Sequence, residues 1–565
     1  MRGIRDSGRA LRGSGTPSMT QKRSLPFWWR VVLQAAVLVL AAAWIYSPVY
    51  HGEFLWDDHT LITDNWMVQS GSLGGLAAIW IEPDGPDYFP LTYTALWIQW
   101  TMFGDDPTGY HLTSIALHAL SGLLLWALLA QLKLPGSWLA AVVFTVHPVC
   151  VESVAWISEI KNTLSQPFFL LSCLFWVKRD ESEQTRASSR WYAGSIITFL
   201  LALLAKPSMV GLPLLTLLYA WWKRQRITGH DLKRMAPLFL LALVMGLVTV
   251  WFQHERAIRE EVLPAGGAIS RMAIAGMAIV FYAIAIVWPV RLIPVYPQWS
   301  AEPVQAWHML PWLGLALIGY VSWQFRSTWG KHVILATGFF LLMIAPVLGL
   351  VDMSFMRISW VSDHFLYLPM IGPIACLVCG AVGLAQSGGE NLSRLCLSII
   401  IMVSVVLGAA SFQDAKHWQT SHDLWSHTAA LNPNAWPAYV WLGDEQFEAG
   451  HFENASRLYA RAAEKSPLFR SMARYRDRVI EILLRQRRYV EAIDLCKKEL
   501  NGNAERGKEA IAGGKAFDKS LSIEKVKRLV RELQQAGCED EGLRLFCSAI
   551  EFMSAESGLD PSQKR

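Results

Sequence analysis

Charged residues are scarce in this sequence. Asp, Glu, Lys and Arg together make up 17% of the 565 residues, whereas hydrophobic residues make up 53% and tryptophan alone occurs 27 times. Soluble domains usually carry about 25% charged residues, so the deficit excludes a single soluble domain and indicates a membrane protein. The net charge of +5 is small and unevenly placed, and it gives no reason to expect a nucleic-acid partner.

Cysteine is scarce as well, with eight residues scattered along the chain. Cys376 and Cys379 have the CxxC spacing, but they lie in an apolar run, where buried cysteines usually pack as small hydrophobic side chains. Cys538 and Cys547 could pair in an oxidising compartment, yet no disulfide framework follows from the spacings. His147 has no second histidine at the spacing of zinc ligands, so the sequence predicts no metal centre.

What the chain has in abundance is apolar sequence. A membrane-spanning helix needs about 20 apolar residues. Runs of that length, or nearly so, fall at about 27–49, 111–132, 137–149, 163–178, 190–205, 207–222, 235–253, 269–290, 308–325, 333–350, 364–386 and 395–411. They predict an all-α, polytopic membrane bundle of eleven or twelve spans. The first run is too long for the core of a cleaved signal peptide and lacks a small-residue cleavage site, so it is expected to remain as a span.

Lysine and arginine predict the side on which each loop lies. They crowd residues 1–26 and the loop at 223–234, and short segments rich in these residues stay in the cytoplasm. The long loop at 50–110 is therefore expected outside. Beyond residue 254 the pattern fits eleven or twelve crossings. We favour eleven, which would place the C-terminal tail on the same side as this loop.

The tail differs in composition from the rest, because charge rises and long apolar runs end near residue 412. Residues 434–467 follow the 34-residue tetratricopeptide (TPR) pattern, with Gly443, Tyr459 and Pro467 at sites typical of that repeat. We therefore expect a TPR-like α-solenoid after the bundle. The predicted domains are a basic cytoplasmic N-terminus at 1–26, the membrane domain at 27–411, repeats at 412–500, and a linker with a terminal helical segment at 501–565.

The strongest chemical signal is the pair Asp57-Asp58, directly after the first span. One of two adjacent carboxylates can take a proton from an attacking hydroxyl while the other orients a substrate or a cation. Their mutual repulsion also raises the pKa of one of them, which suits a general base. The alternative is a solvated loop or a helix cap. A divalent cation remains open, but two ligands do not make a metal site, and no cofactor is expected with certainty.

A second external segment, residues 147–162, carries His147, Glu152, Glu159 and Lys161. The two glutamates are seven residues apart, so one continuous helix would place both on the same face. Lys161 suits a phosphate as a point charge. The alternative is an interfacial helix whose charges are solvated.

Two further positions lie at span boundaries. Lys206 stands between two apolar runs, where it could bind a lipid phosphate or simply extend toward the surface. Asp363 and His364 precede another span, where they could bind substrate or cap the helix.

Five motifs, in this order, resemble the GT-C superfamily of membrane glycosyltransferases, and among them the transmembrane-and-TPR protein O-mannosyltransferases and their bacterial relatives. The motifs are Phe54-Leu55-Trp56-Asp57-Asp58; Tyr88-Phe89-Pro90-Leu91 with Gly109-Tyr110-His111 and Leu117-His118; the segment from His147 to Glu159; Ala205-Lys206-Pro207; and Asp363-His364-Phe365-Leu366-Tyr367-Leu368-Pro369. The chain departs from the family pattern at Cys150, where a histidine is common, and at Ile160, where an arginine is common. These departures leave the sugar and the acceptor open.

The resemblance implies a sugar donor carried on a polyprenyl phosphate, and inverting transfer to a hydroxyl, in first place that of a protein Ser or Thr docked on the TPR-like tail. It implies a bacterial inner membrane, with the first loop and the tail on the periplasmic or extracellular side. Asp57 would be the base with Asp58 beside it, and Lys161 and Lys206 would bind the phosphate. Substrate contacts are expected from His147, Glu152, Glu159, Asp363 and His364. The alternatives are a GT-C enzyme for a lipid or glycan acceptor, a non-catalytic membrane-anchored scaffold, and, in last place, a transporter.

Overall fold

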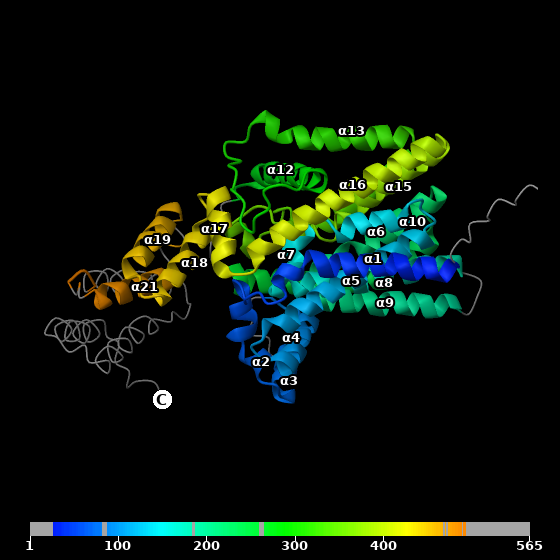
Figure 1. Ribbon diagram of the computed structural model, residues 1–565. Coiled ribbons are helices and arrows are strands. Elements are labelled where there is room, and N and C mark those ends of the chain that lie inside the picture. Colours follow the sequence, from blue (N-terminus) through cyan, green and yellow to red (C-terminus); the bar gives the residue numbers. More distant parts are fainter. Residues whose placement is uncertain are drawn as a thin grey trace, which may run out of the picture.

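The protein is helical throughout the part of the chain that its computed structural model describes, which is residues 26–81, 87–182, 187–258, 265–466, 469, 473–486, 488 and 490–492 (Figure 1). One helix lies on each of the twelve apolar runs: α1 (Phe27–Ile45), α5 (Pro107–Gln131), α6 (Ser137–Thr145), α8 (Ile160–Glu181), α9 (Ala187–Ala205), α10 (Leu212–Arg224), α11 (Gly229–Phe252), α12 (Ala268–Val287), α13 (Leu310–Gln324), α14 (Gly330–Ile344), α15 (Ile371–Ser387) and α16 (Glu390–Ala415). The all-α fold class predicted from the sequence is confirmed.

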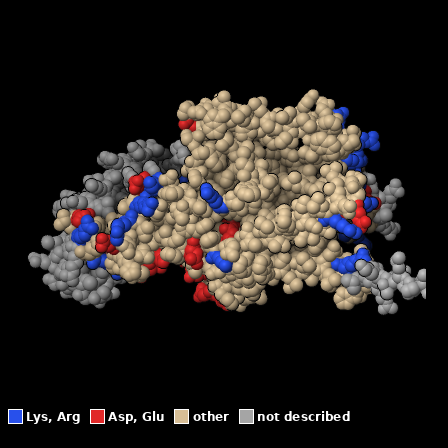
Figure 2. All heavy atoms as spheres, turned by 45° about the horizontal axis from the view of Figure 1, so that its top comes forward, with Lys and Arg blue, Asp and Glu red and all other residues tan. Residues whose placement is uncertain are grey.

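Seven helices within the described residues are long and apolar enough to cross a membrane, so the chain is an integral membrane protein. The other helices of the bundle are shorter or more polar, and the eleven or twelve spans expected from the sequence stay a prediction. Figure 2 shows charged side chains gathered toward the two ends of the bundle and over the tail, with a wide surface between them that carries few. That surface suits the hydrocarbon layer, where exposed charges are costly.

Small and polar residues bring the bundle helices close together. Ser172 on α8 and Ser195 on α9 donate hydrogen bonds to each other's backbone carbonyls, at 2.7 and 3.0 Å. Gly122 on α5 lies against Thr145 of α6. Membrane helices associate through such residues because lipid tails supply no hydrophobic driving force between them.

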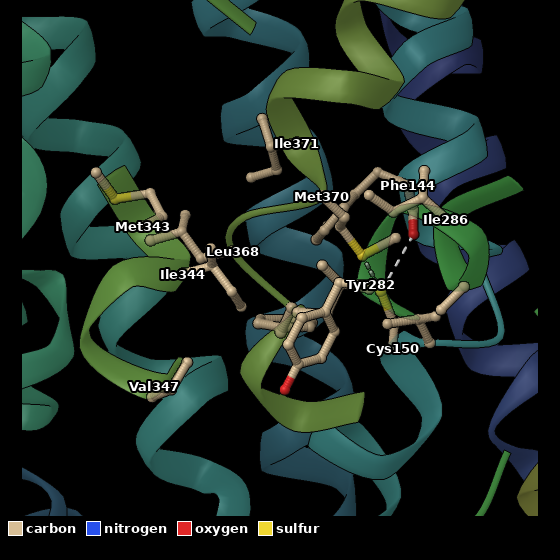
Figure 3. Close-up of a cluster of buried hydrophobic side chains, with 14 of the residues drawn as sticks. Phe144, Cys150, Tyr282, Ile286, Met343, Ile344, Val347, Leu368, Met370 and Ile371 are labelled. Atoms are coloured by element: carbon tan, nitrogen blue, oxygen red, sulfur yellow. Dashed lines mark hydrogen bonds between the residues drawn. The ribbon is translucent and has the colours of Figure 1, made fainter. Parts of the chain in front are cut away.

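The bundle core also explains one departure from the family pattern. Cys150 is fully buried, 3.9 Å from the sulfur of Met370 and 3.5 Å from the carbonyl oxygen of Phe144, in an apolar cluster that includes Tyr282 (Figure 3). Cys150 therefore packs as a small buried side chain.

The loop at 50–110 folds into short helices with a core of their own. A π-helical turn (His59–Thr63) leads to α2 (Trp66–Gln69), α3 (Leu73–Ile81) and α4 (Pro90–Phe103). Their buried apolar residues pack together and against the start of α8. Thr92 on α4 donates a 2.9 Å hydrogen bond to the carbonyl oxygen of Ala205 at the end of α9. The loop is therefore fixed to the end of the bundle.

The tail contains α17 (Ser421–Leu431), α18 (Trp436–Glu448), α19 (Phe452–Lys465) and α21 (Ala473–Arg485). Helices α18 and α19 form an antiparallel hairpin in which Gly443 lies under the ring of Tyr459, whose hydroxyl donates to Asp444 at 2.7 Å. This hairpin has the form of a TPR unit, although assignment of the whole tail to that repeat stays a prediction. The predicted linker and terminal helical segment at 501–565 lie outside the described residues.

The tail and the first loop lie at the same end of the bundle (Figure 1). The backbone N–H of Glu53 donates to the carbonyl oxygen of Gln419 at 2.9 Å, and the side chain of Asn432 donates to the carbonyl oxygen of Val295 at 3.0 Å. Two segments on one side of a membrane are separated by an even number of crossings, as in the eleven-span alternative, in which all spans but the first lie between the loop and the tail.

Gly443 should be sensitive to the smallest substitution. A Cβ atom at this position would lie 2.7 Å from the ring of Tyr459, so Gly443→Ala should destabilise the α18–α19 hairpin by about 1–3 kcal/mol, the usual cost of overpacking. The measurement is the rate of proteolytic cleavage within residues 436–465 of the purified protein in detergent. Gly314→Ala is the control, because no atom lies within 4 Å of a Cβ built there. Equal cleavage of the two variants would contradict the prediction.

Candidate active site

Asp58 anchors the start of the first loop. One carboxylate oxygen accepts a 2.8 Å hydrogen bond from the backbone N–H of Leu55, and the other accepts from both the backbone N–H, at 2.7 Å, and the hydroxyl of Ser158. Burial raises the pKa of Asp58 to about 7, against the effect of these hydrogen bonds, which favour the ionised form. With both oxygens occupied, Asp58 joins the loop to residues near α8. A direct part for it in catalysis stays a prediction.

Asp57 lies next to this anchor and lines a cleft. Its side chain is partly exposed, and the cleft has a volume of about 1310 Å³. Burial raises the pKa of Asp57 above its usual value, Lys161 opposes that shift, and Glu159 adds to it. A carboxylate with a raised pKa that remains accessible can act as a general base near neutral pH.

The segment 147–162 is not one continuous helix. Helix α7 (Cys150–Ala155) ends at Trp156, whose backbone is extended, and a short 3₁₀ turn (Ile157–Glu159) precedes α8. The two glutamates therefore do not share the face that a continuous helix would give them. The break turns the chain so that Glu152 and Glu159 approach the same residue from different sides, and both glutamates are buried.

The residue between the two glutamates is His364. Its Nδ1 lies 2.8 Å from Glu152 and its Nε2 lies 3.8 Å from Glu159. Glu152 also accepts hydrogen bonds from the hydroxyl of Ser362, at 2.8 Å, and from the backbone N–H of His364, at 2.9 Å. Three residues predicted from two separate motifs thus meet at one place.

Two lysines complete this cluster. Lys161 Nζ lies 2.7 Å from one carboxylate oxygen of Glu159, and Lys206 Nζ lies 3.8 Å from the other. Asn162 links Lys206 to Glu159, because its side-chain oxygen accepts from Lys206 at 2.5 Å and its side-chain nitrogen donates to Glu159 at 2.6 Å. Burial alone would raise the pKa of Glu159, but His364 and the two lysines lower it to about 2. Glu159 therefore stays ionised and lies between two ammonium groups.

Two residues of this site have no place in the sequence prediction. Asn162 is one. The other is Asp87, whose carboxylate accepts a 2.6 Å hydrogen bond from Gln253 at the end of α11. Burial raises the pKa of Asp87, whereas Lys161 lowers it. The nearby Tyr88-Phe89-Pro90-Leu91 motif is the signal that could have found Asp87.

Two predicted site residues lie apart from the lysine cluster. His147 is buried, with Nε2 3.0 Å from the carbonyl oxygen of Ile286 near the end of α12. Asp363 is also buried and accepts from the hydroxyl of Tyr296 at 2.9 and 3.1 Å. Burial, followed by the charge of Glu152, raises the pKa of Asp363 well above its usual value. Both residues support the backbone around the site, and substrate contacts for them stay predictions. No three His, Cys, Asp or Glu side chains of the described ranges gather as metal ligands.

The cleft lies between the first loop and the tail. The loop contributes Trp56, Asp57 and His59, and the tail contributes Trp436 and Trp441. Aromatic rings and carboxylates dominate its lining.

Comparison with known proteins gives three kinds of similarity. A family model described as dolichyl-phosphate-mannose-protein mannosyltransferase matches residues 84–254. The human protein O-mannosyl-transferase TMTC4 is 22% identical over 515 residues, covering 77% of this chain and 66% of its own length. The mouse protein of the same name is 29% identical over 209 residues, covering 32% of this chain and 28% of its own. The chain thus spans just under two thirds of the human relative.

Solved structures give a weaker similarity. ArnT from Cupriavidus metallidurans bound to undecaprenyl phosphate has a TM-score of 0.34 and 13% sequence identity, over 72% of this chain and 77% of its own. The same protein in the apo state has a TM-score of 0.31 and 13% identity, over 72% and 76%.

Lys206 should make phosphate binding depend on pH. Burial lowers its pKa to about 8, although Glu159 opposes the shift, so the cation is present below pH 8 and is lost as the pH rises through that value. A polyprenyl phosphate is already fully ionised there, since its second pKa is about 6. Its affinity for the purified protein should therefore fall about tenfold between pH 7 and pH 9.5, as for the loss of one charged contact.

Lys206→Arg is the matched variant, because a guanidinium keeps its charge across this range. Its affinity should stay level between pH 7 and pH 9.5. Parallel curves for the two proteins would remove Lys206 from the phosphate contact.

Proposed function

We propose that the chain is a membrane glycosyltransferase of the GT-C type, and that it moves a sugar from a polyprenyl-phosphate donor to a Ser or Thr hydroxyl of a protein. The observation that carries the proposal is the placement of Asp57 within electrostatic reach of Lys161, at a cleft formed by the first loop and the tail. A base and a phosphate site are what such a transfer requires on either side of the reacting carbon.

The donor phosphate would bind at Lys161 and Lys206. Their side chains are 16% and 10% exposed, so each ammonium is largely withdrawn from water while remaining accessible. Charges in such surroundings interact more strongly than in water. Lys206 lies where α9 ends at the outer end of the bundle, which suits a lipid whose isoprenoid part stays in the membrane.

Transfer would then be a single displacement. The acceptor hydroxyl attacks the anomeric carbon and gives its proton to Asp57. The bond from that carbon to the phosphate oxygen breaks, the lipid phosphate leaves with the bonding electrons, and the configuration inverts. Lys161 and Lys206 stabilise the charge that develops on the leaving phosphate, and the rest of the rate enhancement comes from positioning.

The buried acids of the site would act through the residues that they hold. Glu159 fixes both lysines, and Glu152 fixes His364 and the backbone before α15. Asp58 keeps the loop against Ser158. These contacts limit movement of the base relative to the phosphate site, and reaction rates depend steeply on that geometry.

The acceptor would be an extended protein segment in the cleft between loop and tail. The cleft lies at the end of the bundle where α1 ends, and its tail wall is made mainly by helices α18 and α21. Positive loops mark the cytoplasmic side, so we place the cleft, the first loop and the tail on the periplasmic face of a bacterial inner membrane.

Replacement of Asp57 by Asn tests the base. The amide keeps the shape of the side chain but cannot take a proton, so transfer in a purified system should fall by about 10²-fold or more. The affinity for a polyprenyl phosphate should change by about twofold at most, since the lysines remain. Radioactive sugar transfer to protein and to lipid, measured separately in membranes with and without the chain, identifies the acceptor class.

Asp105→Asn provides the control, because Asp105 is an exposed carboxylate of the same loop that does not line the cleft. Transfer to glycolipid instead of protein would replace the proposed acceptor and leave the base in place. Full activity of Asp57→Asn would reject the mechanism. Absence of transfer by the unmodified chain would favour a scaffold.

A further inference from the structure

The residue before Asp57 has an unfavourable backbone conformation. Trp56 has φ 52°, in the left-handed region that bulky residues rarely adopt. Conformations of this kind persist only where surrounding contacts hold them, and they concentrate at functional sites. Because Trp56 directly precedes Asp57, the proposed base, the contacts that fix Trp56 also restrain the position of Asp57.

Two tryptophans hold the indole of Trp56. Trp156 stacks on it, with ring centroids 4.7 Å apart and an angle of 5° between the planes. Trp425 of α17 contacts it edge to face, at 5.1 Å and 71°. Trp156 belongs to the membrane domain, whereas Trp425 belongs to the tail and is fully buried. The tail thus supplies one of the two aromatic contacts of Trp56.

Hydrogen bonds also join the first loop to the tail. The backbone N–H of Glu53 donates to the carbonyl oxygen of Gln419 at 2.9 Å, and its carboxylate accepts from the backbone N–H of Ser421 at 3.1 Å. On the other side of Asp57, the Asp58 carboxylate is bound by residues of the membrane domain. The proposed base therefore lies between one anchor from the tail and one from the bundle.

We infer that Trp425 is a positioning residue for the transfer reaction: by fixing Trp56, the tail sets the place of the Asp57 carboxylate in addition to any contact with the acceptor. The inference rests on the proposed role of Asp57. A positioning role differs from acceptor docking in the kinetic parameter that a mutation changes. A docking defect raises the KM for the acceptor, whereas a displaced base lowers kcat, and a displacement of about 1 Å can cost about 10²-fold in rate.

The test compares full-length variants in detergent. Trp425→Ala removes the edge-to-face contact with Trp56. We expect kcat to fall at least tenfold, because the rate depends steeply on the position of the base. The Kd for a polyprenyl phosphate should stay within twofold of that of the unmodified protein. Trp425→Phe keeps an aromatic edge and should recover most of the rate. Phe452→Ala is the control, because Phe452 packs on Phe447 within the tail, at 5.4 Å, and does not line the cleft.

Amide hydrogen exchange gives a readout that does not depend on catalysis. Exchange across residues 53–58 should rise in Trp425→Ala and stay unchanged in Phe452→Ala, since only the first variant loses a contact to the loop. Unchanged kcat and exchange in Trp425→Ala would overturn the inference, as would equal losses in both variants. Activity of Asp57→Asn would instead reject the proposed base, and exchange would still decide whether the tail holds the loop.

Discussion

Glu159 is the charge on which the site depends. Two lysines with little exposure to water face its fully buried carboxylate, and His364 approaches from a third side. A buried ammonium without a partner would lose its proton or turn toward water. Glu159 favours the charged form of both lysines, and Asn162 links Lys206 to Glu159 by bonding to both at once. The network thus tolerates two buried ammonium groups at the place where we propose that the donor phosphate binds.

The surrounding fold brings distant segments to this network. Lys161 lies in the first turn of α8, Lys206 follows α9, and His364 precedes α15, so the three residues come from separate segments of the chain. Helices α8 and α9 are joined by the reciprocal hydrogen bonds of Ser172 and Ser195. In the proposed reaction the bundle would hold the donor, and the first loop with the tail would receive the acceptor.

Much of this architecture could be predicted from the sequence, because bilayer crossing imposes long apolar runs that leave little ambiguity. Each of the twelve runs contains a helix, and Gly443 with Tyr459 marked the α18–α19 hairpin correctly. Asp57, Lys161 and His364 could be selected from motifs. The break at Trp156 could not, because it follows from tertiary contacts: the indole stacks on Trp56 and donates to the carbonyl oxygen of Leu55. Asn162 is uncharged, so no charge pattern marks it as a candidate site residue. The contact between Trp56 and Trp425 joins residues far apart in the sequence, and no local sequence pattern predicts it.

The contact between Glu53 and Ser421 joins positions 368 residues apart. During synthesis the first loop emerges long before the segment that closes over it, and every intervening helix must be inserted before the two can meet. Until then Trp56 lacks the Trp425 contact that restrains its backbone. Maturation of the proposed site is thereby coupled to synthesis of α17, and a chain that ends before this helix would carry Asp57 without the contacts that restrain the residue before it.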